Sequence, residues 1–129
     1  MKIISLRYWH IGALFVSNLG CAVDIRGAPD SWTNTAATGL WQDATKWSLG
    51  VAPTSTHTAT FITNVNTKTV TINSATPAGN LTISNLTLRG LGGSTNTLQI
   101  TNAPGSTLLI RNELIVGTNA VLRLTNANL

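Results

Sequence analysis

The chain has 129 residues, of which 43% are hydrophobic and only 9% are charged. This length allows one domain at most, and the low charge with abundant Thr, Asn, Ser and Gly favours a strand-rich extracellular protein over a helical cytosolic one. Its net charge of +4 comes from eight basic and four acidic residues without any run of Lys or Arg, so neither a nucleic-acid interface nor a polybasic membrane anchor is expected.

Residues 1–22 have the pattern of a secretory signal peptide. Lys2 and Arg7 supply the positive start, residues 11–16 form the apolar centre, and a small-x-small cleavage site ends at Ala22. The apolar run is too short for a membrane helix, so no transmembrane helix is expected. The alternative is a hydrophobic N-terminal strand. A signal peptide would place the mature chain outside the cell or at its surface.

Cys21 is the only cysteine of the chain. Gly20 directly before it suits lipoprotein processing, but Asn18 and Leu19 do not match that signal. We therefore favour removal of Cys21 with the signal peptide over lipidation. The mature chain would then hold no disulfide, and its stability would come from stacking. Residues 23–30 are expected to be a linker.

Residues 31–69 differ in composition from the rest and are interpreted as an N-terminal cap with lead-in strands. Short strands or elements flanking a turn are expected at 31–33, 39–41, 46–48 and 58–62. The open end of a repeat structure exposes apolar core and strand edges, and large aromatic side chains cover that area with few residues. The aromatic residues of this region are Trp32, Trp41, Trp47 and Phe61.

These aromatic residues also allow a ligand-binding interpretation. Exposed indole faces stack on sugar rings, and Trp41 and Trp47, with Asp43 and Lys46 between them, could form such a platform in a carbohydrate-binding module. The interpretation as the core of the cap is favoured, because three tryptophans within sixteen residues are an economical source of buried area.

Residues 70–129 repeat themselves. The segment 98–103 (LQITNA) returns 24 positions later as LRLTNA, and the segment 81–85 (LTISN) returns 27 positions later as LLIRN. Periods of this length are typical of solenoids. Apolar residues alternate within each period, which indicates short strands with one inward face. The inward pairs are Val70/Ile72, Leu81/Ile83, Leu86/Leu88, Leu98/Ile100, Leu108/Ile110, Leu114/Val116 and Leu122/Leu124.

The repeat predicts an all-β fold, a parallel β-helix or solenoid of about two to three coils behind an aromatic-rich cap. About three short strands and three turns rich in Gly, Asn and Pro fit one coil. Asn85 and Asn112 recur at equivalent places. Stacked Asn side chains can hydrogen-bond along the axis, so these two residues are a candidate corner ladder. The alternative is that Asn simply tolerates a turn there.

The spacing of residues in the cap carries a resemblance. The pattern comprises Trp32, Trp41, Asp43-Ala44, Lys46-Trp47, Gly50, Pro53 and Ala59-Thr60-Phe61, followed by strands rich in Thr, Val, Ile and Asn. It resembles the N-terminal region of large secreted bacterial β-helix proteins with autotransporter-associated β-strand repeats. The resemblance implies a long right-handed β-helix opening after the signal peptide. Because such proteins usually continue much further, a chain that stops at Leu129 inside its third coil is expected to be a fragment.

Side chains for catalysis are few and scattered. Asp24, Asp30, Asp43 and Glu113 form no closely spaced pair for acid and base work. His57 lies between two Thr residues and is expected on an exposed strand or loop. No Cys and His spacing suits zinc. We therefore expect no catalytic residue, no metal site and no cofactor.

One enzyme hypothesis, a polysaccharide lyase or hydrolase, follows from the β-helix architecture. Related folds combine acid clusters and calcium with Arg or Lys on one solenoid face, and Arg89, Arg111 and Arg123 are the candidates here. Their spacings of 22 and 12 mean that they need not share a face. Without nearby carboxylates they cannot hold calcium.

The sequence therefore favours a secreted or cell-surface, non-enzymatic β-solenoid segment with a structural or adhesive role. Inward Val, Leu and Ile would hold a rigid rod whose Thr, Asn and Ser face meets partners, either cell-surface polysaccharide or further solenoid coils. Two coils are marginal, so self-association through the open end, or aggregation, is expected. The alternatives are a carbohydrate-binding module using exposed Trp and a fragment of a polysaccharide-active β-helix enzyme.

Overall fold

The computed structural model describes residues 27–101 and 107–125, so the signal-peptide interpretation of residues 1–22 and the fate of Cys21 lie outside it. In the described ranges no helix is long and apolar enough to cross a membrane. In chain order the elements are β1 (Asp30–Ser31), β2 (Thr38–Leu40), η1 (Ala44–Lys46), β3 (Thr60–Ile62), β4 (Lys68–Ile72), η2 (Ala78–Asn80), β5 (Thr82–Leu88), β6 (Asn96–Thr101), β7 (Leu109–Val116) and β8 (Ala120–Thr125), where η marks a 3₁₀ turn.

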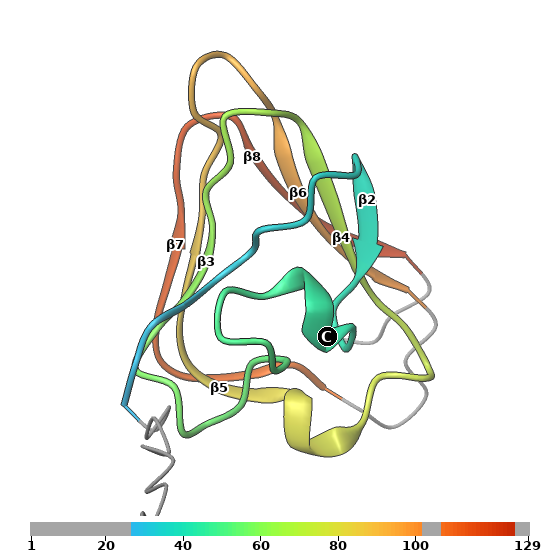
Figure 1. Ribbon diagram of the computed structural model, residues 1–129, viewed down its shortest axis with the longest axis vertical. Coiled ribbons are helices and arrows are strands. Elements are labelled where there is room, and N and C mark those ends of the chain that lie inside the picture. Colours follow the sequence, from blue (N-terminus) through green and yellow to red (C-terminus); the bar gives the residue numbers. More distant parts are fainter. Residues whose placement is uncertain (1–26, 102–106, 126–129) are drawn as a thin grey trace, which may run out of the picture.

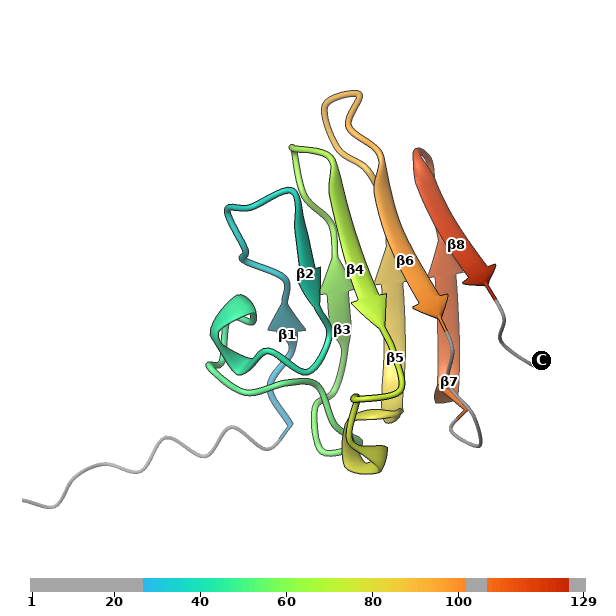
Figure 2. The ribbon, with the colours of Figure 1, turned by 90° about the vertical axis from the view of Figure 1, so that its right-hand side faces the viewer.

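The strands form two parallel sheets, ordered β1-β3-β5-β7 and β2-β4-β6-β8. Each passage of the chain adds one strand to each sheet, and we call such a passage a rung, from rung 1 (β1 and β2) to rung 4 (β7 and β8). Three returns connect the rungs, which gives about three turns of a solenoid. Figure 1 shows the rungs superimposed as a triangle, and Figure 2 shows them side by side. The predicted all-β parallel solenoid is confirmed.

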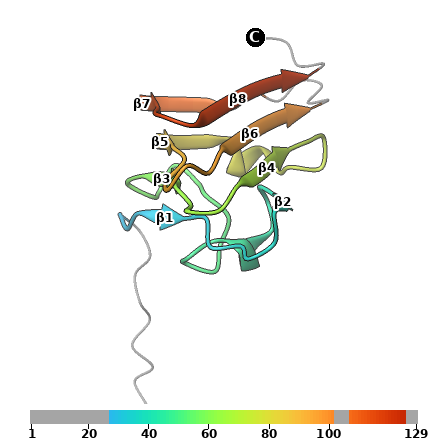
Figure 3. The same ribbon diagram turned by 90° about the horizontal axis from the view of Figure 1, so that it is seen from above.

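The solenoid is right-handed. In Figure 1 the chain rises along the side of β3 and β7, crosses the top and descends along β4 and β6. Figure 3, seen from above, shows that successive rungs recede from the viewer of Figure 1. A clockwise path that recedes is a right-handed helix, the hand strongly preferred for connections between parallel strands.

Each rung has two strands, not the three that the sequence suggests. The apolar pairs expected as separate strands at 81/83 and 86/88 fall on or beside the single strand β5, which Figure 1 shows turning from the base of the triangle up its left side. Alternation in β5 breaks at Ser84 and Asn85, which are both half-buried. A strand can therefore cover two sides of the triangle by bending, and hydrophobic pairs alone do not reveal that the strand continues.

The strand register reproduces the sequence repeat and contains one irregularity. Leu98 pairs with Leu122, at the predicted offset of 24, and Ile83 pairs with Ile110, at the predicted offset of 27. Beyond Ile83 the register shifts by one residue. Such a shift is a β-bulge, which bends the strand locally.

The bulge overturns the proposed ladder of Asn85 and Asn112. Asn85 lies opposite Glu113, because the register shift moves Asn112 out of the matching position. The Asn85 Nδ2 instead donates to the backbone oxygen of Thr58, which precedes β3. Axial hydrogen bonding by Asn85 is therefore present, but its acceptor is a carbonyl group and not a second Asn.

The interior consists of columns of side chains at matching register. Val70, Leu98 and Leu122 form one such column, in which the first two are 0% exposed and Leu122, in rung 4, is 38% exposed. The predicted inward pairs from Val70 to Ile100 are all buried, which confirms them. The buried apolar core comprises Trp32, Trp41, Trp47, Ala52, Ile62, Val70, Ile72, Leu81, Ile83, Leu86, Leu88, Leu98 and Ile100.

The sheets begin earlier than the sequence suggests. Rung 1 begins at Asp30, the last residue of the expected linker, and continues into the stretch interpreted as cap and lead-in, yet β1 pairs in parallel with β3 and β2 with β4. The backbone N–H of Gly27, in the expected linker, also donates to Thr56 O at 2.8 Å. The inward positions of rung 1 hold Asp30, Trp32 and Gly39 instead of Val, Leu or Ile, so alternation is not visible there.

Side chains at the turns hold each rung to the one before it. Asn64 Nδ2 donates to Trp32 O at 3.0 Å, Asn80 Nδ2 to Pro53 O at 3.0 Å, and Ser94 Oγ to Asn64 O at 2.7 Å. The same relation to an earlier carbonyl holds for Ser84, Asn85 and Thr101. These bonds satisfy carbonyl groups where the chain leaves the sheets. In all of them the later part of the chain supplies the donor.

Candidate functional site

Three tryptophans from rung 1 and the following return form one buried cluster. The ring centroid of Trp47 lies 5.0 Å from those of Trp32 and Trp41, with interplanar angles of 81° and 75°. Such edge-to-face packing adds to the free energy gained by burial. Trp32, Trp41 and Trp47 are 3%, 0% and 3% exposed. Because protein atoms cover their faces, these rings cannot stack on a sugar. Their burial agrees with the interpretation as the core of the cap.

Polar bonds and close packing fix the same cluster in place. The Trp47 Nε1 donates to Trp41 O at 2.7 Å, and the Trp41 Nε1 donates to Asn80 O at 2.8 Å. A Cβ atom on Gly39 would lie only 2.8 Å from the Trp32 ring, so β2 can pack against this ring only with glycine at position 39. The cluster therefore joins rung 1 to the return that precedes rung 3.

Phe61 is not part of this cluster, contrary to its assignment as a cap aromatic. It lies in the middle of β3, between the buried residues Thr60 and Ile62, and is half-buried. Its register partners are Ser31 in β1 and Thr87 in β5. The alternation of the strand turns Phe61 to the outer face.

Asp43 and Lys46 lie at the surface of the cap and stabilise its turn. Asp43 Oδ1 accepts hydrogen bonds from Thr45 Oγ1 at 2.7 Å and from Thr45 N at 3.1 Å. These bonds lower the pKa of Asp43 below its ordinary value of 3.8, with the Thr45 hydroxyl as the largest cause. Desolvation raises the pKa, whereas the Thr45 N–H and the positive charge of Lys46 lower it further. Lys46 Nζ is 3.9 Å from Asp43 Oδ2, and exposed pairs of this kind contribute little to stability.

The described acidic residues lie on separate elements. Asp30 is in β1, Asp43 precedes η1 and Glu113 is in β7, while Asp24 falls outside the described residues. Asp30 is buried, and its Oδ1 accepts from Ser48 Oγ at 3.0 Å and from the backbone N–H of Leu49 at 3.1 Å. Across residues 27–101 and 107–125, no three His, Cys, Asp or Glu side chains gather where a metal ion could bind.

His57 is buried, which corrects the expectation of a surface residue. Only 2% of it is exposed. Its Nδ1 accepts from the backbone N–H of Thr54 at 3.2 Å, and its own backbone N–H donates to Thr54 O at 3.2 Å. The neighbours Thr56 and Thr58 are exposed, and this polar context concealed that the imidazole between them points inward. His57 closes a turn.

The three arginines of the enzyme hypothesis are distributed over both sheets. Arg111 lies in β7 and Arg123 in β8, which belong to different sheets. Arg89 follows β5, and its Cγ would lie 3.3 Å from a Cβ atom on Gly117 in the next rung. The stem of Arg89 thus covers the backbone of rung 4. The arrangement does not gather the three guanidinium groups on one face.

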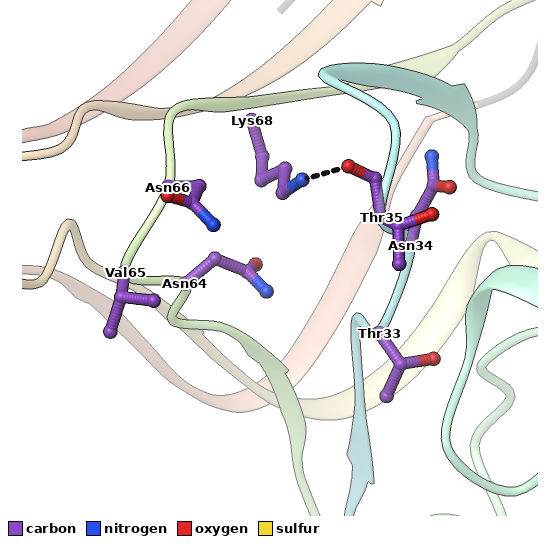
Figure 4. A pocket seen from close by; sticks show the side chains of 7 residues that line it. All are labelled: Thr33, Asn34, Thr35, Asn64, Val65, Asn66 and Lys68. Carbon is purple, nitrogen blue, oxygen red and sulfur yellow. Dashed lines mark hydrogen bonds between the residues drawn. The ribbon is translucent and has the colours of Figure 1, made fainter.

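A pocket of about 230 Å³ opens at the turn that joins the two sheets in rungs 1 and 2. Figure 4 shows Lys68 reaching toward Thr35 of rung 1, with Asn64 and Asn66 nearby. The pocket is lined by Thr33, Asn34, Thr35, Asn64, Val65, Asn66 and Lys68. Sequence reasoning missed this site, although Lys68 precedes Val70 and Ile72 at the same alternating inward positions.

Lys68 is 4% exposed, and its Nζ donates to the backbone oxygens of Thr35 and Ala36, both at 2.9 Å. Among the residues that the structure describes, it forms no ion pair. Asn64 Nδ2 binds Trp32 O, whereas the buried Asn64 Oδ1 has no donor there. The pocket therefore combines an ammonium group without a counter-charge and an unused acceptor.

No family model matches the chain, and searches of curated proteins and of solved structures found no match. A functional proposal for this chain therefore depends on its fold and on the geometry of its surfaces.

Proposed function

We propose that the chain is a secreted or cell-surface, non-enzymatic β-solenoid segment with a structural or adhesive role. The observation that supports this proposal is the difference between its two ends. Rung 1 is closed by the tryptophan cluster, whereas rung 4 presents inward-type apolar side chains and two strand edges. A closed first rung and an open last rung suit a rod on which further coils stack.

The apolar surface of rung 4 consists of large side chains that are 38% to 52% exposed. Leu114, Val116, Leu122 and Leu124 occupy inward positions, and Leu109, Ile115 and Val121 occupy outward positions. In the described residues β7 and β8 each pair with a strand on one side only. Unpaired edges next to apolar side chains favour addition of another strand layer.

The outer face of the second sheet supports an adhesive role. Thr69 and Thr97 are register partners on β4 and β6, and Thr71 pairs with Gln99. These residues alternate with the buried ones and are half-buried. They give the rod a regular surface of hydroxyl and amide groups, which can exchange hydrogen bonds with a polysaccharide or a protein partner.

The proposed location and family follow from the N-terminal sequence. The signal-peptide pattern of residues 1–22 supports export, with cleavage after Ala22. The spacing of Trp32, Trp41 and Trp47 supports a place at the start of a protein with autotransporter-associated β-strand repeats. In such a protein this chain would supply the cap and the first rungs of a longer rod.

Sedimentation of the purified chain over a range of concentrations tests the proposal. We expect the chain to self-associate through rung 4. The double substitution Leu122→Lys and Leu124→Lys, which places two charges on the open end, should abolish association. Val65→Lys is the matched control, because Val65 is 66% exposed and lies on rung 2. It should leave association unchanged. A monodisperse wild-type monomer that melts cooperatively would contradict the proposal.

A further inference from the structure

We propose that the pocket between rungs 1 and 2 binds a carboxylate-bearing sugar, with Lys68 holding the carboxylate. The site is separate from the open end, so this proposal can succeed or fail independently of the role in surface structure. It is based on the charge of Lys68, on the unused hydrogen-bonding groups of the pocket and on the chemistry of its lining.

The charge of Lys68 is the first argument. Only 4% of Lys68 is exposed, so its ammonium group has lost most of its hydration, and two neutral carbonyl oxygens replace only part of it. Burial of a charge is costly unless an opposite charge is near. The described residues provide none, since their one ion pair joins Asp43 and Lys46. An anion in the pocket would supply the missing counter-charge.

The number of positive groups limits the charge of the ligand. Lys68 is the only cation among the seven residues that line the pocket. A doubly charged phosphate or sulfate is typically held by several cationic groups or N–H donors, whereas this site offers one ammonium group. A singly charged carboxylate matches it. Two N–H groups of Lys68 are used by Thr35 and Ala36, which leaves the third for the ligand.

The remaining lining favours hydroxyl groups on the ligand. Asn64 Oδ1 is buried without a donor among the described residues, so its desolvation has already occurred, and a ligand hydroxyl gains a hydrogen bond there when the Asn64 side chain turns toward the pocket. Thr33, Thr35 and Asn66 add hydroxyl and amide groups at the exposed rim. Val65 is the only apolar residue of the lining, and no aromatic ring contributes. This composition suits a polyhydroxylated ligand better than an apolar carboxylic acid.

Titration of the ¹⁵N-labelled chain by NMR tests the assignment, with glucuronate, glucose and acetate as probes. Glucuronate should shift the Lys68 ammonium resonance and the amides of residues 33–36 and 64–66 in a saturable way. Glucose, which lacks the charge, should bind about tenfold more weakly or worse. If acetate binds as tightly as glucuronate, the assignment to a sugar is wrong. If no probe gives a saturable shift, Lys68 is a structural cross-link only.

Two pairs of variants complete the test. Lys68→Met should remove glucuronate binding, whereas Lys46→Met, at an exposed lysine outside the pocket, should not. Because Lys68→Met also removes donors from two carbonyl groups, Thr35→Phe serves as a second variant. Thr35 is exposed and lines the pocket, so a phenyl ring there should block entry without disturbing the core. Thr58→Phe, at an exposed site elsewhere, is its control. Unchanged glucuronate binding in both pocket variants would overturn the proposal.

Discussion

Rung 1 and rung 4 occupy equivalent places at opposite ends of the same two sheets, but their inward side chains have different surroundings. In rung 1, Trp32 and Trp41 are covered by a return of the chain and by Trp47. In rung 4, Val116 and Leu124 are 47% and 39% exposed. An inward position in a solenoid is thus only a potential core position. A neighbouring layer must cover it before its burial contributes to stability.

The cap is where the largest effect is expected. Trp41→Ala removes a fully buried ring that contacts Trp47 and donates to Asn80, and large-to-small changes of this kind cost about 3–5 kcal/mol. Urea denaturation should show a large loss of unfolding free energy. Leu40→Ala, on β2 and 43% exposed, is the control and should change little. A Trp41→Ala protein as stable as the wild type would show that the cap does not hold rung 1.

The same column of the core offers a direct comparison of a covered and an uncovered layer. Leu98 and Leu122 are register partners, and they are 0% and 38% exposed. Leu98→Ala should cost about 2–5 kcal/mol, and Leu122→Ala less than about half of that, because less apolar area is removed from the core. Urea unfolding of both variants at low protein concentration measures the difference. Equal losses would mean that rung 4 is covered in solution.

The bulge in the first sheet predicts a smaller contrast. Asn85 donates to the backbone oxygen of Thr58, whereas Asn112 lies at the register shift. Asn85→Ala should therefore lower the unfolding free energy by about 1 kcal/mol, and Asn112→Ala by no more than about 0.5 kcal/mol. Thermal denaturation of the two variants separates these outcomes. Similar losses at both sites would show that the bond from Asn85 to Thr58 O is not the source of the difference.

The smallest effect is expected at the surface of the cap. Thr45→Val removes the hydroxyl that binds Asp43, so the pKa of Asp43 should rise toward 3.8. Because the folded-state pKa is below the unfolded value, this interaction adds stability above the unfolded pKa and loses it as the pH falls through the folded pKa. An NMR titration of the Asp43 carboxyl measures the change. Lys46→Gln should raise the pKa less, and the reverse order would contradict the assigned cause.

Much of the solenoid could be predicted because its middle rungs follow a simple rule. From Val70 to Ile100 each inward strand residue except Asn96 is Val, Leu or Ile, so the period of two is visible and the repeat gives the pairing. The first rung could not be predicted in this way, since Asp30, Trp32 and Gly39 occupy its inward positions. Their burial depends on a return that is specific to the cap.

The candidate pocket was hidden for a related reason. Lys68 continues the inward alternation of Val70 and Ile72, but charge normally indicates exposure, so the sequence pattern does not predict this residue in the interior. His57 was misplaced by the same assumption, because it is flanked by exposed Thr residues. In a narrow solenoid, position along the strand decides orientation before polarity does. Turns then supply the carbonyl partners that a buried polar group needs.

The hydrogen bonds at the turns give the solenoid a direction. Asn64, Asn80 and Ser94 each donate to a carbonyl group that precedes them in the chain. In these three bonds the earlier layer offers the acceptor and the later layer brings the donor, whereas the bond from Trp41 Nε1 to Asn80 O runs the other way. A chain delivered with its amino end first would present these groups in the order in which they are needed. The first layers can then serve as a template before the remaining layers are in place.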